Sequence, residues 1–140
     1  MMADTRSKNM TWKVVGHILV FVHASEAPSD AEWDEALVLF RAVPDVARIR
    51  ALVFSSGGAP DARQRARLHT VLGKTKATIA VLTPSALARA AGTAIAWFVP
   101  GLRIFDPDDV ERALDHLDAA RPERPGLTRA LAELRREMRV

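Results

Sequence analysis

Short apolar runs alternate along this chain with segments of helical periodicity, and this alternation limits the folds that it can adopt. Four runs have the length and composition of buried strands: residues 18–22, 51–54, 77–82 and 102–105. The first is apolar on both of its faces, which is typical of a strand covered from both sides. The connections between the runs are too long for hairpins, so we expect parallel pairing through right-handed crossovers.

A hairpin is predicted ahead of the first run. Residues 12–15 have strand composition, and Gly16 and His17 separate them from residues 18–22. A two-residue connection that contains glycine suits a tight turn, because glycine adopts positive φ without steric cost. The predicted fold class is therefore α/β, with a mixed, mostly parallel sheet of about five strands covered by helices. An extra C-terminal amphipathic helix is expected beyond it.

Local signals predict where the helices begin and end. Ser29 and Glu32 form a capping-box pattern, and apolar side chains follow it at helical spacing up to a stop near Pro44. The other predicted starts are Pro60 and Pro84 as first helical residues, Thr83 as an N-cap, and the acidic segment 106–109. We expect the helix at Pro84 to run to Phe98.

Length and composition fit one globular domain. The chain has 140 residues, of which 49% are hydrophobic and 26% charged. It contains no cysteine, which fits a reducing compartment, so we expect a cytoplasmic location. The N-terminus is polar and no apolar run approaches the ~20 residues that span a bilayer, so neither secretion nor a membrane span is expected. The predicted organisation is a disordered segment 1–9, a domain 10–118, a Pro/Arg linker 119–126 and a C-terminal helix 127–140.

The net charge of +3 and the pI of about 9.9 raise the question of nucleic-acid binding. Basic and acidic side chains balance at 14 each through Asp118, so the whole excess lies in the C-terminal segment. A basic tail without interleaved aromatic residues or a known binding motif is a weak signal. We therefore expect no nucleic-acid partner.

The C-terminal helix carries apolar residues at heptad-like spacing: Leu127, Leu131, Leu134 and Met138. A helix of this length is marginal in isolation, so another surface must cover this face. Two alternatives are open. The helix docks on its own domain, or it contacts a second copy or another protein, which includes self-assembly into a structural protein.

The order of elements resembles that of the STAS domains of anti-sigma-factor antagonists and of the SpoIIAA-like proteins. The local resemblance lies in the strand 77–82, the Ala-rich helix after it, the short strand ending at Phe105 and the segment 111–117. It covers residues 10–118. The resemblance implies a regulatory protein-binding module that is not an enzyme.

Phosphoswitch members of that family carry a hydroxyl residue directly after an aspartate at the start of a helix, and a kinase phosphorylates it. Asp61 takes the place of that aspartate, but Ala62, Arg63 and Gln64 follow it, so the hydroxyl is missing. The resemblance therefore implies a module without the usual phosphoserine switch. The partner-binding loop that it predicts consists of Ser55, Ser56, Gly57, Gly58, Asp61 and Arg63. We interpret the two serines as polar loop residues beside glycines.

The helix of residues 85–98 is apolar almost all round, with Arg89 and Thr93 as its main polar residues. Such a helix is expected to be buried. One interpretation is close packing on the sheet, with the C-terminal helix over its second face. The other is a partner surface or an apolar cleft near Trp97 and Phe98. A cleft there gives an alternative function, a SpoIIAA-like carrier of an apolar small molecule or lipid.

No pattern of catalytic or metal-binding residues is evident. The sequence lacks a P-loop, a dinucleotide fingerprint and a nucleophile elbow. The four histidines, His17, His23, His69 and His116, give no spacing that predicts a shared metal ion. We therefore expect no enzymatic activity, no cofactor and no metal.

Overall fold

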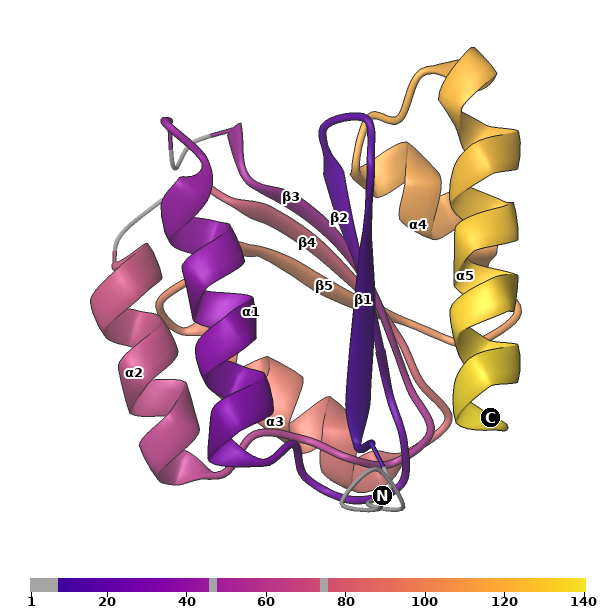
Figure 1. The fold of residues 1–140 in the computed structure, drawn as a ribbon. Helices are drawn as coiled ribbons and strands as arrows, with labels where there is room; N and C mark the ends of the chain where they lie inside the picture. Colours follow the sequence, from indigo (N-terminus) through magenta and orange to yellow (C-terminus); the bar gives the residue numbers. More distant parts are fainter. Residues whose placement is uncertain (1–7, 46–47, 74–75) are drawn as a thin grey trace, which may run out of the picture.

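The computed structural model describes residues 8–45, 48–73 and 76–140, which contain a central five-stranded sheet (Figure 1). The strands are β1 (Met10–Val15), β2 (Ile18–His23), β3 (Arg50–Ser55), β4 (Thr78–Leu82) and β5 (Gly101–Phe105). They lie in the order β1-β2-β3-β4-β5, with β1 antiparallel to β2 and the other pairs parallel. The predicted fold class, α/β with a mixed and mostly parallel sheet, is confirmed.

Helices cover both faces of this sheet. On one face lie α1 (Asp30–Ala42), α2 (Ala62–Leu72) and α3 (Ala86–Ala96), and on the other lie α4 (Val110–His116) and α5 (Arg124–Met138) (Figure 1). A short 3-10 turn, η3 (Arg121–Glu123), leads into α5. In the part of the chain that the structure describes, no helix has both the length and the apolarity needed to cross a bilayer.

The two faces of the sheet carry separate cores, because side chains alternate along each strand. In β2, Leu19 and Phe21 belong to the core beneath α1, α2 and α3. Ile18 and Val20, which alternate with them, belong to the core beneath α4 and α5. The expectation that this strand is covered on both faces is confirmed. The expected turn at Gly16 joins it to β1, and Gly16 has a φ of 59°.

The first predicted helix start is confirmed, and the second is wrong. Ser29 caps α1, and Glu32 completes the capping box. However, α2 begins after Asp61 and not at Pro60. The Asp61 carboxylate accepts the backbone N–H of Gln64 at 2.8 Å, which satisfies a free donor of the first turn. Proline has no side-chain acceptor and offers only a favourable φ.

The predicted start of α3 at Thr83 and Pro84 is also wrong. Ser85 is the N-cap, and its hydroxyl accepts the N–H of Ala88 at 3.2 Å. The Thr83 hydroxyl instead donates to the backbone carbonyl of Ser55 at 2.7 Å, so it links the ends of β3 and β4. The helix ends at Ala96, short of the predicted end.

The C-terminal helix docks on the chain's own sheet, which is the first of the two alternatives. Leu127, Leu131 and Leu134 are at most 4% exposed, and Met138 packs beside them. They contribute to the core beneath α4 and α5, so this apolar face is occupied within the chain. The helix begins at Arg124, which places part of the expected linker inside it.

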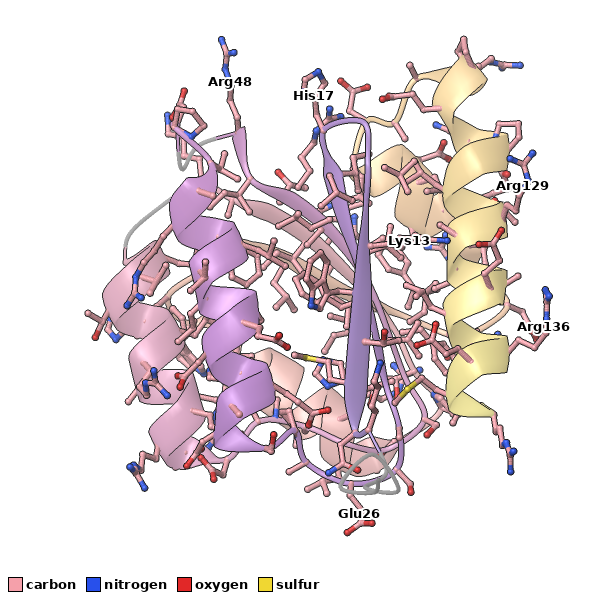
Figure 2. The ribbon with its side chains drawn as sticks, in the orientation of Figure 1. Lys13, His17, Glu26, Arg48, Arg129 and Arg136 are labelled. Carbon is pink, nitrogen blue, oxygen red and sulfur yellow. The ribbon has the colours of Figure 1, made fainter. Side chains whose placement is uncertain are left out.

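A surface ion pair joins α5 to the hairpin of β1 and β2. Figure 2 shows Lys13 of β1 pointing toward α5, where its ammonium lies 2.5 Å from the carboxylate of Glu133. This position puts α5 and α3 on opposite faces of the sheet (Figure 1). The interpretation that the C-terminal helix covers the second face of the Ala-rich helix is therefore wrong. Helix α5 instead packs beside β1 and β2, on the face of the sheet opposite to α3.

The expected disordered segment 1–9 falls mostly outside the described residues, which begin at Lys8. Asn9 is placed against α1, because its backbone N–H donates to the carboxylate of Glu32 at 2.9 Å. The ammonium of Lys8 lies 3.7 Å from the carboxylate of Glu137 in α5. The beginning of β1 is thus tied to helices on both faces of the sheet.

Candidate functional site

The loop after β3 lies against the loop after β2 at the carboxyl edge of the parallel strands, where α/β proteins commonly bind ligands. The N–H of Gly58 donates to the carbonyl of Ala24 at 2.7 Å. A Cβ at Gly58 would lie only 2.1 Å from the carbonyl oxygen of Glu26. Glycine is therefore required there, because any side chain would push the two loops apart.

The hydroxyls of the two loop serines point inward. Ser55 is 3% exposed, and its hydroxyl donates to the carbonyl of Gly58 at 2.6 Å and accepts the N–H of Gly57 at 3.1 Å. The hydroxyl oxygen of Ser56 is buried and has no hydrogen-bond partner among the described residues. A kinase would reach either hydroxyl only after the loop opened.

The predicted partner-binding loop is thus divided by the fold. Its serines and Gly58 face inward, whereas Asp61 and Arg63 are exposed at the start of α2. All six predicted loop residues lie in the short segment 55–63. Only part of that segment is exposed and available to a partner.

A cavity of about 80 Å³ lies between the sheet and the layer formed by α1, α2 and α3. Its walls are almost entirely apolar, and they include Phe21, Trp33, Phe40, Val53, Val81 and Ile95. At the end near the loops, the walls are formed by His23, Ser55 and the segment 58–60. Sequence analysis missed this cavity, because its volume depends on how far the helices stand from the sheet.

His23 is the polar side chain at this end of the cavity whose hydrogen bonding is incomplete. It is 6% exposed, and its Nδ1 has no hydrogen-bond partner in the described part of the chain. Burial lowers the pKa of His23 from 6.5 to about 4, although the negative charge of Glu32 opposes this shift. The imidazole is therefore neutral at pH 7. A histidine at the end of an otherwise apolar strand is the sequence signal that could have identified it.

The other histidines are in different parts of the fold. His17 lies in the hairpin turn (Figure 2), His69 stacks on Phe98 with ring centroids 4.5 Å apart, and Nε2 of His116 lies 2.7 Å from the carbonyl of Gly101. Within the described ranges, no group of three or more His, Cys, Asp or Glu side chains could hold a metal ion.

The outer face of α3 carries an apolar surface, here called the α3 ridge. It is formed by Leu87, Ala90, Ala94 and Trp97. Leu87 is 70% exposed and Trp97 is 87% exposed, and these are the two largest exposures of a big apolar side chain in the described residues. Large apolar side chains that share one exposed face mark interaction surfaces more often than single exposed ones do.

A surface groove runs along the α3 ridge toward α2. Leu87, Ala90 and Ala94 line one side of it, and the segment 59–61 with Arg65 lines the other. Ala59, Pro60 and Ala91 line both this groove and the cavity, so they form the wall between the two.

The four residues predicted to form an apolar surface or cleft on the Ala-rich helix have different surroundings. The Arg89 guanidinium lies 2.5 Å from the Asp106 carboxylate, and the Thr93 hydroxyl donates to the carbonyl of Arg89. Phe98 packs on α2 through His69, and Trp97 faces solvent. The expectation that this helix is buried all round is wrong, since its outer face is uncovered.

No family model, no curated protein and no solved structure matched this chain.

Proposed function

We propose that this chain is a non-enzymatic regulatory module of the STAS type that binds a protein partner through the α3 ridge. The observation that carries the proposal is the exposure of Trp97 and Leu87 on one face of one helix. Covering each of these side chains with a partner would stabilise a complex by about 1.5–3 kcal/mol. Tryptophan is among the residue types that dominate binding energy at protein interfaces.

The α3 ridge is held on a rigid support. The inner face of α3 is buried through Ala88, Ala91 and Ile95. Gly92 lies so close to the sheet that a Cβ there would come within 2.9 Å of Ile104 Cδ1. A surface that is fixed before binding loses less conformational entropy when the partner docks.

The shape of the α3 ridge suits an amphipathic helix of the partner. From Leu87 to Trp97 the ridge extends ~15 Å, the rise of about three helical turns. The residues that line the groove beside it are mostly apolar, and Asp61 and Arg65 are the charged ones among them. An apolar groove that can accept the apolar face of an amphipathic helix is typical of helix-in-groove recognition.

The proposed module works without a phosphoserine switch. The hydroxyls of Ser55 and Ser56 are buried, and Asp61 caps α2 directly ahead of Ala62. Regulation would therefore come from the partner's own availability or from a ligand, and not from a charge added to this loop.

Lipid carriage is less well supported. Trp97 and Phe98 do not line the cavity, whose volume is about 80 Å³. Because an engineered cavity of about 150 Å³ holds benzene, a long acyl chain does not fit in this space.

Site-specific photo-crosslinking in the native cells tests the proposal. A benzophenone amino acid is placed at Ala90 in the α3 ridge or at Thr128 on the exposed face of α5. We expect a discrete protein adduct from position 90 only. That adduct should disappear when Leu87→Ala and Trp97→Ala are combined, because both anchors are then lost.

The matched control is Val38→Ala in α1, which removes another large exposed apolar side chain, 60% exposed, outside the ridge. This variant should keep the adduct. Equal adducts from positions 90 and 128, or an adduct that survives the double substitution, would show that the α3 ridge is not the binding surface.

A further inference from the structure

We infer that the outer edge of β1 is a pairing site for a second copy of this chain. In this dimer the two β1 strands lie side by side and antiparallel, with Lys13 of one copy opposite Lys13 of the other, and the two sheets become one. The surface is separate from the α3 ridge. The inference therefore goes beyond the proposed partner binding and does not depend on it.

The first step of the argument is the direction of the backbone groups of β1. The N–H of Ala24 donates to the carbonyl of Asn9 at 2.9 Å, so these residues form a hydrogen-bonded pair that extends the β1–β2 ladder. Hydrogen-bonded and non-hydrogen-bonded pairs alternate along antiparallel strands. In the observed register, the N–H and C=O groups of Lys13 therefore point to β2, whereas those of Trp12 and Val14 point to the outer edge.

The beginning of this edge is occupied, and its middle is open. The same alternation directs the N–H of Met10 outward, and this group donates to the Glu32 carboxylate at 3.1 Å. Strand β1 is the first in the order of the sheet, and no helix or strand among the described residues lies in front of it in Figure 1. Trp12 and Val14 each offer one backbone donor and one backbone acceptor to another strand.

The second step is that the side chains of the same two residues are exposed. Trp12 is 37% exposed and Val14 is 51% exposed. When Lys13 lies opposite its own copy, Trp12 of each chain lies opposite Val14 of the other. Aromatic side chains opposite β-branched ones stabilise a pair of strands. One register thus covers both apolar side chains and uses the outward backbone groups of both residues.

The charge of Lys13 is compatible with this register. Its side chain points to α5, where the ammonium lies 2.5 Å from the carboxylate of Glu133 (Figure 2). Like charges that lie directly opposite each other destabilise a pair of strands. The dimer instead brings together two ion pairs, in which each positive charge already has a negative neighbour.

The edge of β1 also lacks the features with which proteins usually block an exposed strand. Those features include a proline, a bulge and an unpaired charge at the edge. Residues 10–15 contain no proline, their register with β2 has no bulge, and the charge of Lys13 is paired. At the other edge of the sheet, the exposed side chain of β5 is the charged Arg103. This contrast favours pairing at β1.

Sedimentation equilibrium of the full chain tests for the dimer. We expect the mass to rise reversibly from 15.3 kDa toward twice that value between about 10 μM and 1 mM, because a small interface gives a weak dimer. Val14→Lys, which places a charge opposite Trp12 of the second copy, should weaken the dimer about tenfold or more. Val38→Lys on α1 is the matched control, since Val38 is 60% exposed. It should leave the dimer unchanged, and so should the combined Leu87→Ala and Trp97→Ala in the α3 ridge.

Disulfide formation tests the register, because the chain has no cysteine of its own. Across a non-hydrogen-bonded antiparallel pair the Cα atoms are ~4.5 Å apart, a separation that a disulfide can span. Lys13→Cys should therefore give a covalent dimer under mild oxidation. His17→Cys in the exposed hairpin turn is the control, since its two copies would lie at opposite ends of the paired strands. Its covalent dimer should form about tenfold more slowly or less.

Four results would overturn the inference. They are a single-chain mass over the whole concentration range, a dimer that Val14→Lys does not weaken, a dimer that is lost in the α3 ridge variant, and equal rates of disulfide formation in Lys13→Cys and His17→Cys. The amide spectrum of Val14→Lys must show a folded protein. If it does not, Lys13→Cys tests the same contact with both apolar side chains in place.

Discussion

The carboxylate of Glu32 in α1 accepts the backbone N–H of Met10 at the start of β1, at a distance of 3.1 Å. The same carboxylate accepts the N–H groups of Asn9 and Ser29. One side chain therefore completes a helix cap and anchors the first strand of the sheet. It also supplies the negative charge that acts on the buried His23.

Glu32→Gln should lower the free energy of unfolding by about 1 kcal/mol, because an amide offers one acceptor oxygen where the carboxylate offers two. Burial raises the pKa of Glu32, but hydrogen bonds from Ser29, Asn9 and Met10 outweigh it and hold the pKa below 4.5. Its stabilising effect is thus present above pH 4.5 and is lost as the pH falls further. Urea denaturation between pH 7 and pH 3 measures both effects.

Glu35→Gln is the control for this substitution, since Glu35 is exposed on the same helix. It should change the stability by less than about 0.5 kcal/mol. Removal of the Glu32 charge should also lower the pKa of His23 below about 4, because that charge raises it. An unchanged His23 titration in Glu32→Gln would contradict the electrostatic link between the two residues.

His23 should make the protein less stable in mild acid. Its pKa is about 4 in the folded protein and 6.5 in the unfolded chain, so the unfolded state binds the additional proton. The stabilisation is complete above pH 6.5 and is lost as the pH falls from 6.5 to 4, by about 3 kcal/mol at most. Urea denaturation at intervals across this range measures the slope. His23→Gln should flatten it, whereas His17→Gln in the hairpin turn should leave it unchanged.

The arrangement of the sheet and its helices could be predicted because it depends on patterns within short segments. Ser29 and Glu32 identify the start of α1 without any knowledge of the rest of the fold. The starts proposed at Pro60 and Pro84 are wrong for a local reason as well. Asp61 and Ser85 provide side-chain acceptors for the first turn, and these decide where each helix begins.

The candidate sites could be predicted only in part, because burial is decided by distant segments. The apolar composition of α3 favoured a fully buried helix, but α5 covers the opposite face of the sheet and leaves Trp97 exposed. Whether His23 Nδ1 finds a hydrogen-bond partner depends on α1 and on the loop after β3, which line the same cavity as His23. No periodicity within β2 carries that information.

Leu131→Ala should destabilise the protein by about 2–4 kcal/mol, because Leu131 fills the core between α5 and the sheet. Ala132→Ser at the adjacent exposed position should have little effect. Chemical denaturation measures both variants, and sedimentation should give the same molecular mass for each folded protein. A mild effect of Leu131→Ala together with a change in mass would instead mean that this face joins two chains.

Gly58→Ala should destabilise the loop after β3 by about 2 kcal/mol or more, because the new Cβ would overlap the Glu26 carbonyl. Gly57→Ala is a closely matched control, since its Cβ would meet Ser25 at 3.4 Å, an ordinary contact. Thermal unfolding measures the global loss, and amide hydrogen exchange at Gly58 and Ser56 reports the local opening. If both variants unfold alike, the close approach of the two loops does not hold the loop in place.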